Sequence, residues 1–154
     1  MNRFSKLPEL IVAPNGARKT KKDHPNLPIT ITEIVEEADK CFKCGANAIH
    51  AHIRDKNESH TLDPGLYREL IKELKIKVPN MPVQITTESV GKYSPREQFD
   101  VVKTILPESA SVAFIEMLPD IKDYKLAKDF YEFSSDNNVQ VQHILYSVKD
   151  LKYF

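Results

Sequence analysis

Two histidines separated by a single residue, His50 and His52, are the side chains of this sequence best suited to metal chemistry. They lie in a run with Ile49, Ala51 and Ile53 that predicts a buried strand. Side chains alternate between the two faces of a strand, so both imidazoles are expected on one face, about 6.5–7 Å apart along the chain. Two imidazoles at that spacing could share one metal ion. The alternative is a pair of core histidines with hydrogen-bond partners and no ligand.

A second predicted strand, at 83–88, also carries polar side chains on one face. The polar face of the two strands consists of His50, His52 and Arg54, followed by Gln84, Thr86 and Glu88. Barrel enzymes build their sites from such residues near the carboxyl ends of their strands. Glu88 is the nearest carboxylate on this face and is a candidate ligand. His60 and His143 could also act as ligands, but we expect both to be ordinary residues.

Cys41 and Cys44 are the only cysteines, and their C-x-x-C spacing could indicate zinc or redox chemistry. A zinc ribbon needs a second pair of ligands, and the sequence has no further cysteine. A redox pair is favoured at the N-terminus of a helix, whereas these residues fall at the predicted end of one, just before Gly45. We therefore expect buried, inert and reduced thiols.

The segment 17–26 is a long polar loop rich in lysine and arginine that follows the first predicted strand. Long ordered loops that leave the end of a buried strand are often functional. The basic residues could be a solvated surface, or they could attract an anionic substrate. The sequence leaves both interpretations open.

Strands and helices alternate along the whole sequence. Apolar runs predict strands at 10–13, 48–55, 83–88, 110–115 and 139–146. Helices are predicted after the N-cap residues Thr30, Asp63 and Ser94, and within 123–135, whereas 55–62 is predicted to be a polar loop. The resulting βαβαβαβαβ order favours parallel strands joined by right-handed crossovers.

This order fits either an open doubly wound sheet or part of a (β/α)8 barrel. An open sheet carries helices on both faces and its strands are continuously apolar, whereas two strands here have a polar face. We therefore predict an α/β fold of TIM-barrel-type parallel βα units, truncated to about four units plus a fifth strand. The sequence has no glycine-rich phosphate loop and no dinucleotide fingerprint.

Length and charge narrow the class of protein. The 154 residues suggest one domain, 1–154, and the 22 basic and 22 acidic residues balance. This balance argues against a partner that is nucleic acid or a membrane surface. No apolar run approaches the roughly 18 residues of a membrane-spanning helix, and no secretory signal follows Met1. A cytoplasmic protein is expected.

Several segments together resemble the β-keto acid cleavage enzymes, whose founding activity is 3-keto-5-aminohexanoate cleavage in lysine fermentation. The segments are 13–18, 26–30, 48–55, 62–68, 84–88 and 93–95, and they occur in this order along the chain. The resemblance is more specific than the two histidines alone. A histidine pair on a strand also occurs in amidohydrolase barrels, but there it typically lies on the first strand, and here another strand precedes it.

The resemblance implies a zinc-dependent TIM barrel that condenses a β-keto acid with acetyl-CoA, in a retro-Claisen type of acyl transfer that gives acetoacetate and a new CoA ester. It implies that His50 and His52 bind zinc, which would act as a Lewis acid on the substrate oxygens. Thr86 corresponds to a family position that hydrogen-bonds the substrate carboxylate. Asn15, Thr87 and Glu88 are assigned to the same substrate pocket. Some members carry a glutamate at the position of Arg18, so the particular keto acid is left open.

A family barrel has eight strands and about 250 residues. The third zinc ligand of the family, a glutamate, lies on a late strand, as do its acid/base aspartate and an arginine, so the catalytic residues are expected beyond Phe154. The open edges of an incomplete barrel favour association with a second copy or a companion chain. The alternative is a catalytically inactive half barrel that binds metal weakly or self-associates.

Overall fold

A five-stranded parallel sheet organises the computed structural model, which describes residues 8–120, 122 and 124–154. The strands follow one another in the order β1 (Ile11–Val12), β2 (Ala48–Ala51), β5 (Val83–Thr86), β6 (Ser109–Ala113) and β7 (Gln140–Ile144). All four pairings within this sheet are parallel. The predicted α/β fold with parallel βα units is therefore confirmed.

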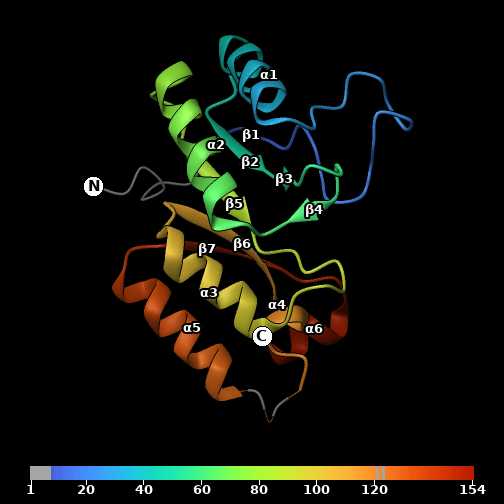
Figure 1. Cartoon of the computed structure of the whole chain (residues 1–154). Coiled ribbons are helices and arrows are strands. Elements are labelled where there is room, and N and C mark those ends of the chain that lie inside the picture. Colours follow the sequence, from blue (N-terminus) through green and yellow to red (C-terminus); the bar gives the residue numbers. More distant parts are fainter. Residues whose placement is uncertain (1–7, 121, 123) are drawn as a thin grey trace.

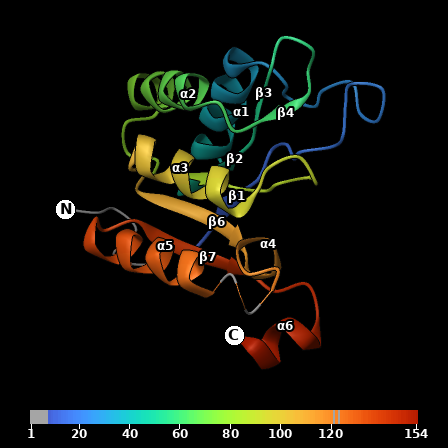
Figure 2. The same cartoon turned by 60° about the horizontal axis from the view of Figure 1, so that its bottom comes forward.

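The crossover helices are α1 (Ile31–Lys43), α2 (Pro64–Lys77), α3 (Pro95–Ile105) and α5 (Tyr124–Asp136). Each contacts the next along the chain, and they lie side by side along one side of the sheet (Figures 1 and 2). A doubly wound sheet would reverse its strand order and place helices on both faces. Sequential strands under one layer of helices are instead the arrangement of a half barrel.

The core fills the space between the helices and the outer face of the sheet. Fully buried side chains of the strands include Ile49, Ala51, Ile85, Ala110 and Val112. They belong to one cluster with helix residues such as Ile34, Leu70, Leu74, Val102 and Phe130. Because this face is apolar, the alternate residues of the same strands point to the inner face.

The inner face carries two rows of polar side chains, set by the parallel register. His50 pairs with Gln84, Gln84 with Ser109, and Ser109 with Gln140. The next row contains Thr86, Ser111 and Gln142. The polar face predicted for two strands therefore extends across four.

The predicted strand 48–55 and the polar loop after it are partly wrong. β2 ends at Ala51, and β3 (Ile53–Arg54) forms an antiparallel hairpin with β4 (His60–Thr61). Asp55 makes the turn, because its carboxylate accepts hydrogen bonds from the backbone N–H groups of Asn57 and Ser59 at 2.8 and 3.0 Å. An Asp side chain that bonds the backbone in this way favours a tight turn over a longer loop.

The carboxyl-terminal third also differs from the prediction. The strand predicted to reach 115 ends at Ala113, where a short helix, α4 (Phe114–Met117), begins. A further helix, α6 (Val148–Tyr153), was not predicted. Its start is marked by Ser147, whose side chain accepts a hydrogen bond from the backbone of Asp150 at 3.2 Å. Among the described residues, no helix is long and apolar enough to cross a membrane.

The two cysteines are free thiols, but only one is even partly buried. Cys41 lies in the last turn of α1, and burial raises the pKa of its thiol. Cys44 is exposed at the end of that helix, so the prediction that both are buried is wrong for it. Cys44 is the C-cap residue of α1, beyond the helical turns whose apolar side chains pack on the core.

Glu33 attaches the basic loop 17–26 to the start of α1. Its carboxylate accepts hydrogen bonds from the backbone N–H groups of Ile29 and Thr30 at 2.9 and 3.0 Å, and from Lys21 Nζ at 2.5 Å. The Lys21 bond and then the backbone bonds lower the pKa of Glu33 to about 2. Thr30 completes the predicted capping box.

Replacement of this carboxylate, Glu33→Gln, is expected to lower the free energy of unfolding at pH 7 by about 1 kcal/mol. Because the folded-state pKa lies below the ordinary value of 4.5, the contribution is present above pH 4.5 and is lost as the pH falls toward 2. Urea denaturation between pH 7 and pH 2 measures the difference. Glu36→Gln, at an exposed position of the same helix, is the control, and an equal loss in both variants would contradict the assignment.

Candidate functional site

The imidazoles of His50 and His52 face each other at the carboxyl end of β2. Their Nε2 atoms are 3.1 Å apart, and the ring planes are nearly perpendicular. His50 Nδ1 lies 2.8 Å from Gln84 Oε1, its neighbour across the sheet. Since an amide oxygen only accepts, His50 carries its proton on Nδ1, and its Nε2 lone pair accepts a hydrogen bond from His52 Nε2–H.

Burial keeps both imidazoles uncharged. It lowers the pKa of His50, against the opposing effects of the Gln84 hydrogen bond and Glu88. Burial, followed by the nearby His50, His60, Arg54 and Arg18, lowers the pKa of His52 to about 3. Neutral imidazole is the form that binds metal ions, and a metal ion at this pair would require the His52 proton to move from Nε2 to Nδ1.

Glu88 connects the histidine pair to the loops around it. One carboxylate oxygen lies 2.8 Å from Arg18, and the other lies 3.8 Å from His52 Nδ1. His60 Nε2 donates to the backbone carbonyl of Glu88 at 2.8 Å. The Glu88 N–H donates to Thr86 Oγ1 at 3.0 Å. The nearest carboxylate predicted from the strand pattern therefore does lie beside the histidines.

Asn15 holds the backbone of the histidine segment. Its Nδ2 donates to the carbonyls of Pro28 and His52 at 3.1 and 2.9 Å, and its Oδ1 accepts from the His52 N–H at 3.1 Å. Both amide donors are thus used within the protein. Asn15 joins the end of β1, the start of α1 and the histidine segment, and these contacts favour a positioning role over direct contact with substrate.

Thr86 and Thr87 lie on opposite sides of the chain. Thr86 belongs to the inner row, and its hydroxyl lies 3.3 Å from that of Ser111. The Thr87 hydroxyl instead lies within 3.2 Å of Gln98 Oε1, on α3, and 3.0 Å of the Ser111 carbonyl. The contacts of Thr87 therefore place it toward the helices, away from the histidine pair.

Three residues near the histidines were not assigned a role from the sequence alone. Gln84 orients His50, His60 supports Glu88, and Arg18 pairs with Glu88. Gln84 could have been found from the strand register, because the residue paired directly with His50 on the neighbouring parallel strand shares its face. The other two depend on how the hairpin and the first loop fold over the sheet, which the local sequence does not encode.

His143 lies elsewhere, on β7, between the rings of Tyr131 and Phe154 at 5.2 and 4.5 Å. This packing agrees with the prediction of an ordinary residue. Within the described ranges 8–120, 122 and 124–154, no group of three or more His, Cys, Asp or Glu side chains is arranged to hold a metal ion. His50 and His52 are thus a pair rather than a full ligand set in this part of the chain.

The geometry of this pair fits a metal ion. Two imidazoles bound at tetrahedral angles to one zinc ion have nitrogens about 3.3 Å apart, since each Zn–N bond is about 2.0–2.1 Å. The observed 3.1 Å between the Nε2 atoms is close to that spacing. Gln84 accepts a hydrogen bond from His50 Nδ1. Histidines that bind a metal through one ring nitrogen usually donate a hydrogen bond from the other in this way. His52 Nδ1 is buried without a hydrogen bond and has Glu88 nearby.

The profile of the beta-keto acid cleavage enzyme family matches residues 10–154. The chain belongs to this family. The resemblance seen in the sequence segments is thereby confirmed. The two histidines lie within the residues that match the family.

Curated relatives carry related activities in their names. A 3-keto-5-aminohexanoate cleavage enzyme of Fusobacterium nucleatum is 36% identical over 72 residues, which are 47% of this chain and 26% of the relative. The 3-oxoadipate:acetyl-CoA acetyltransferase of Cupriavidus necator is 28% identical over 102 residues, 66% of this chain and 35% of the relative. The chain thus spans about a quarter to a third of the length of these relatives.

Solved structures support the fold alone. The apo structure of ObcA aligns with a TM-score of 0.63 and 18% identity, over 83% of this chain and 32% of that chain. A type I 3-dehydroquinate dehydratase of Clostridium difficile aligns with a TM-score of 0.59 and 15% identity, over 88% of this chain and 50% of that chain. These matches agree with a half barrel of the TIM-barrel type.

The hydrogen bonds of the Asn15 side-chain amide to Pro28 and His52 are called the amide clamp here. Asn15→Ala removes this amide clamp and is expected to lower the free energy of unfolding by about 2–3 kcal/mol, because buried backbone groups of Pro28 and His52 lose their partners. Urea denaturation measures the change. Asn57→Ala, in the exposed hairpin turn, removes an equal side chain whose amide makes no such clamp, and should change the stability by less than about 0.5 kcal/mol. Similar losses in the two variants would show that the clamp contributes nothing specific.

Proposed function

We propose that this chain forms the part of a β-keto acid cleavage enzyme that holds zinc through His50 and His52 and binds the keto acid on the inner face of the sheet. The family match supports the reaction class, in which a β-keto acid and acetyl-CoA give acetoacetate and a new CoA ester. The observation that carries the proposal is the 3.1 Å approach of the two Nε2 atoms in uncharged, oriented imidazoles. The cytoplasmic location expected from the sequence belongs to the same proposal.

A zinc ion held there would supply Lewis acidity to the substrate oxygens. The chain's own residues would do the rest of the positioning. Gln84 fixes the proton of His50 on Nδ1, and the Glu88 carboxylate lies 3.8 Å from His52 Nδ1, the nitrogen that would carry the His52 proton once Nε2 held zinc. Thr86 and Glu88 are the proposed contacts to substrate. The hydrogen bonds of Asn15 and Thr87 to other protein groups favour a role in positioning the site.

The proposed reaction also needs groups that the described residues do not supply. In the sheet of the described residues, β1 and β7 are edge strands, and Gln140 and Gln142 of β7 are exposed. Exposed edges and an open inner face favour further strands against this sheet, whichever polypeptide provides them. We propose that such strands complete the ligand set.

A second candidate function is a non-catalytic half barrel that binds metal weakly or self-associates. It is favoured by the finding that no third His, Cys, Asp or Glu joins the histidine pair among residues 8–120, 122 and 124–154. Large apolar side chains are exposed near the carboxyl end, among them Tyr146, Val148, Leu151 and Tyr153. Three of these side chains belong to α6, and exposed apolar side chains gathered on one element favour an interaction surface.

Zinc titration followed by competition with a chromophoric chelator tests the metal site. His52→Gln is expected to weaken zinc binding by at least tenfold, because it removes one of the two imidazoles. His24→Gln, which removes an exposed imidazole of the first loop, should leave the affinity unchanged. Equal zinc affinity in His52→Gln and the unchanged chain would exclude the proposed ligand.

Acetoacetate formation from acetyl-CoA and a set of β-keto acids tests the activity, with the molar mass and zinc content of the same sample measured in solution. The proposal expects turnover only where further strands complete the barrel, and loss of turnover in His50→Gln. A zinc-binding assembly with no turnover on any keto acid would support the non-catalytic half barrel. Turnover that persists in His50→Gln would contradict the proposed site.

A further inference from the structure

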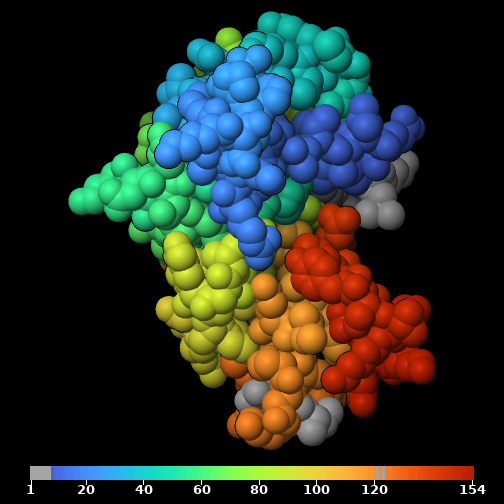
Figure 3. All heavy atoms as spheres, turned by 90° about the vertical axis from the view of Figure 1, so that its right-hand side faces the viewer, coloured from blue at the N-terminus to red at the C-terminus, as the bar shows by residue number. Residues whose placement is uncertain are grey.

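A basic pocket lies beside the histidine pair, formed by three loops at the carboxyl ends of the first strands. They are the loop between β1 and α1, the β3–β4 hairpin and the loop between β5 and α3. Figure 3 shows the first loop, in blue, beside the hairpin, in green. The cavity has a volume of about 640 Å³, within the range of small-molecule sites. The carboxyl end of the strands is also where barrels bind their ligands.

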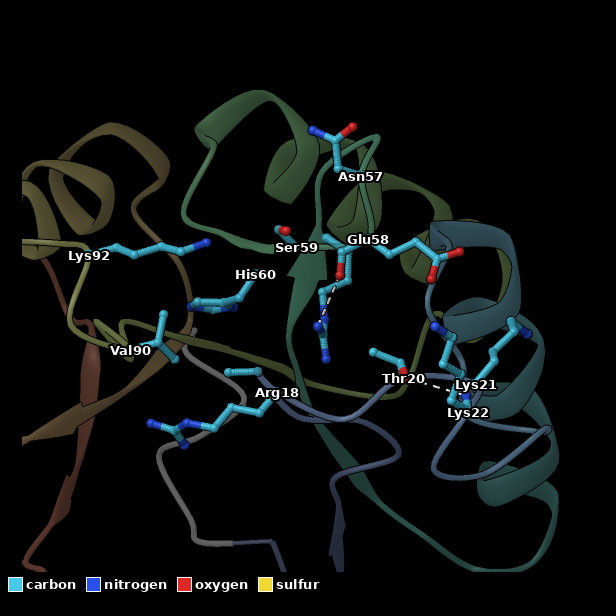
Figure 4. Close-up of a pocket in the computed structure, with 12 residues that line it drawn as sticks. Arg18, Thr20, Lys21, Lys22, Asn57, Glu58, Ser59, His60, Val90 and Lys92 are labelled. Atoms are coloured by element: carbon cyan, nitrogen blue, oxygen red, sulfur yellow. Dashed lines mark hydrogen bonds between the residues drawn. The ribbon is translucent and has the colours of Figure 1, made fainter.

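The lining of this pocket is strongly cationic. Its charged residues are Arg18, Lys21, Lys22, Arg54 and Lys92, with Glu58 as the single carboxylate. Figure 4 shows Lys92 on the same side as His60, Lys21 and Lys22 on the opposite side, and the Glu58 side chain extending away from His60. The chain as a whole has no net charge, so this concentration of positive charge is local.

Three of these cations have no carboxylate within ion-pair distance among the described residues. Arg18 pairs with Glu88 and Lys21 with Glu33, but Lys22, Lys92 and Arg54 form no ion pair with any residue of the described ranges. Positive charges gathered in a concave, loop-lined site raise the local concentration of anions. The basic loop that the sequence left open between two interpretations thus contributes to a defined cavity.

Arg54 is the strongest indication of an anionic ligand. It is only 8% exposed, and its guanidinium donates to the backbone carbonyls of Glu58, Gly16 and Lys19. Its Nε is buried without a hydrogen bond. Its direct partners are neutral carbonyls, and only the more distant carboxylates of Glu58 and Glu88 act on its charge, so a further anion close to the guanidinium would be stabilised. These three carbonyls fix the charge at the wall of the pocket.

We propose that this pocket binds a phosphate group of a phosphate-bearing ligand. Tetrahedral oxyanions suit clustered lysines and arginines, which offer several charge-assisted donors at once. Lys22 and Lys92, from opposite sides of the pocket, would attract the anion, and Arg54 would supply fixed positive charge at its wall. Coenzyme A is the first phosphate-bearing probe because relatives act on acetyl-CoA by name, and this choice rests on the proposed function.

The pocket is coupled to the histidine pair through Glu88. The same carboxylate contacts Arg18, at the pocket, and lies 3.8 Å from His52 Nδ1. His60 lines the pocket, and its ring centroid is 5.4 Å from that of His52. The pocket and the histidine pair are therefore adjacent, and one molecule anchored here by phosphate could reach both places.

Isothermal titration of the zinc-free chain with inorganic diphosphate, coenzyme A and pantetheine tests the proposal. Diphosphate and coenzyme A should bind, and pantetheine, which lacks phosphate, should bind at least tenfold more weakly. The double variant Lys22→Gln/Lys92→Gln should weaken diphosphate binding by roughly tenfold, and added salt should weaken it further. Both lysines are exposed, so the variant is expected to fold.

The matched control is Lys72→Gln/Lys75→Gln, which removes the same charge from the exposed surface of α2. Equal loss of diphosphate binding in both double variants, or no loss in either, would overturn the proposal. Diphosphate that binds and competes with coenzyme A identifies the coenzyme as the source of the phosphate. Diphosphate that binds without competing keeps the phosphate site and assigns it to another ligand.

This test does not depend on metal or turnover. If His52→Gln leaves zinc affinity unchanged while the chain still binds diphosphate, the proposed function is contradicted and the phosphate site is supported. If diphosphate binding fails while zinc binding persists, only the phosphate site falls. Phosphate affinity and zinc affinity are therefore measured on separate samples of the same variants.

Discussion

The structure depends on the alternation of side chains across a parallel sheet whose outer face is covered by helices. Ile49, Ala51 and Ile85 are fully buried beneath those helices, so the residues between them must point inward. That constraint puts His50 beside Gln84 on the inner face. A shift of one residue in register would exchange the core with the site, and the apolar core therefore fixes where the imidazoles point.

The polar groups of the site are held by a small number of strong contacts. Burial keeps His50 and His52 uncharged, Gln84 fixes one tautomer, and Asn15 holds the backbone of His52 from two other segments. The Glu88 carboxylate forms an ion pair with Arg18 and also lies near His52. The result is a pair of neutral donors beside a cationic pocket, which is an environment suited to a metal ion and an anionic substrate.

Much of the fold could be predicted from the sequence because its signals are local. Strand periodicity, the capping boxes at Thr30 and Ser94 and the Asp63–Pro64 helix start all describe interactions within a few residues, and each lies where it was expected. The pairing of His50 with His52 follows from the same periodicity. The β3–β4 hairpin, the end of β6 and the contacts of Arg18 and Arg54 could not be predicted, because they depend on segments that meet only in the folded chain.

The central claim is that both imidazoles bind one zinc ion through Nε2. X-ray absorption spectroscopy at the zinc edge of the loaded chain tests it most directly, since imidazole rings add a characteristic scattering pattern beyond the nearest atoms. The account predicts two imidazole nitrogens at about 2.0–2.1 Å from zinc, and one in His52→Gln. A spectrum with no imidazole contribution, or one that His52→Gln leaves unchanged, would contradict it.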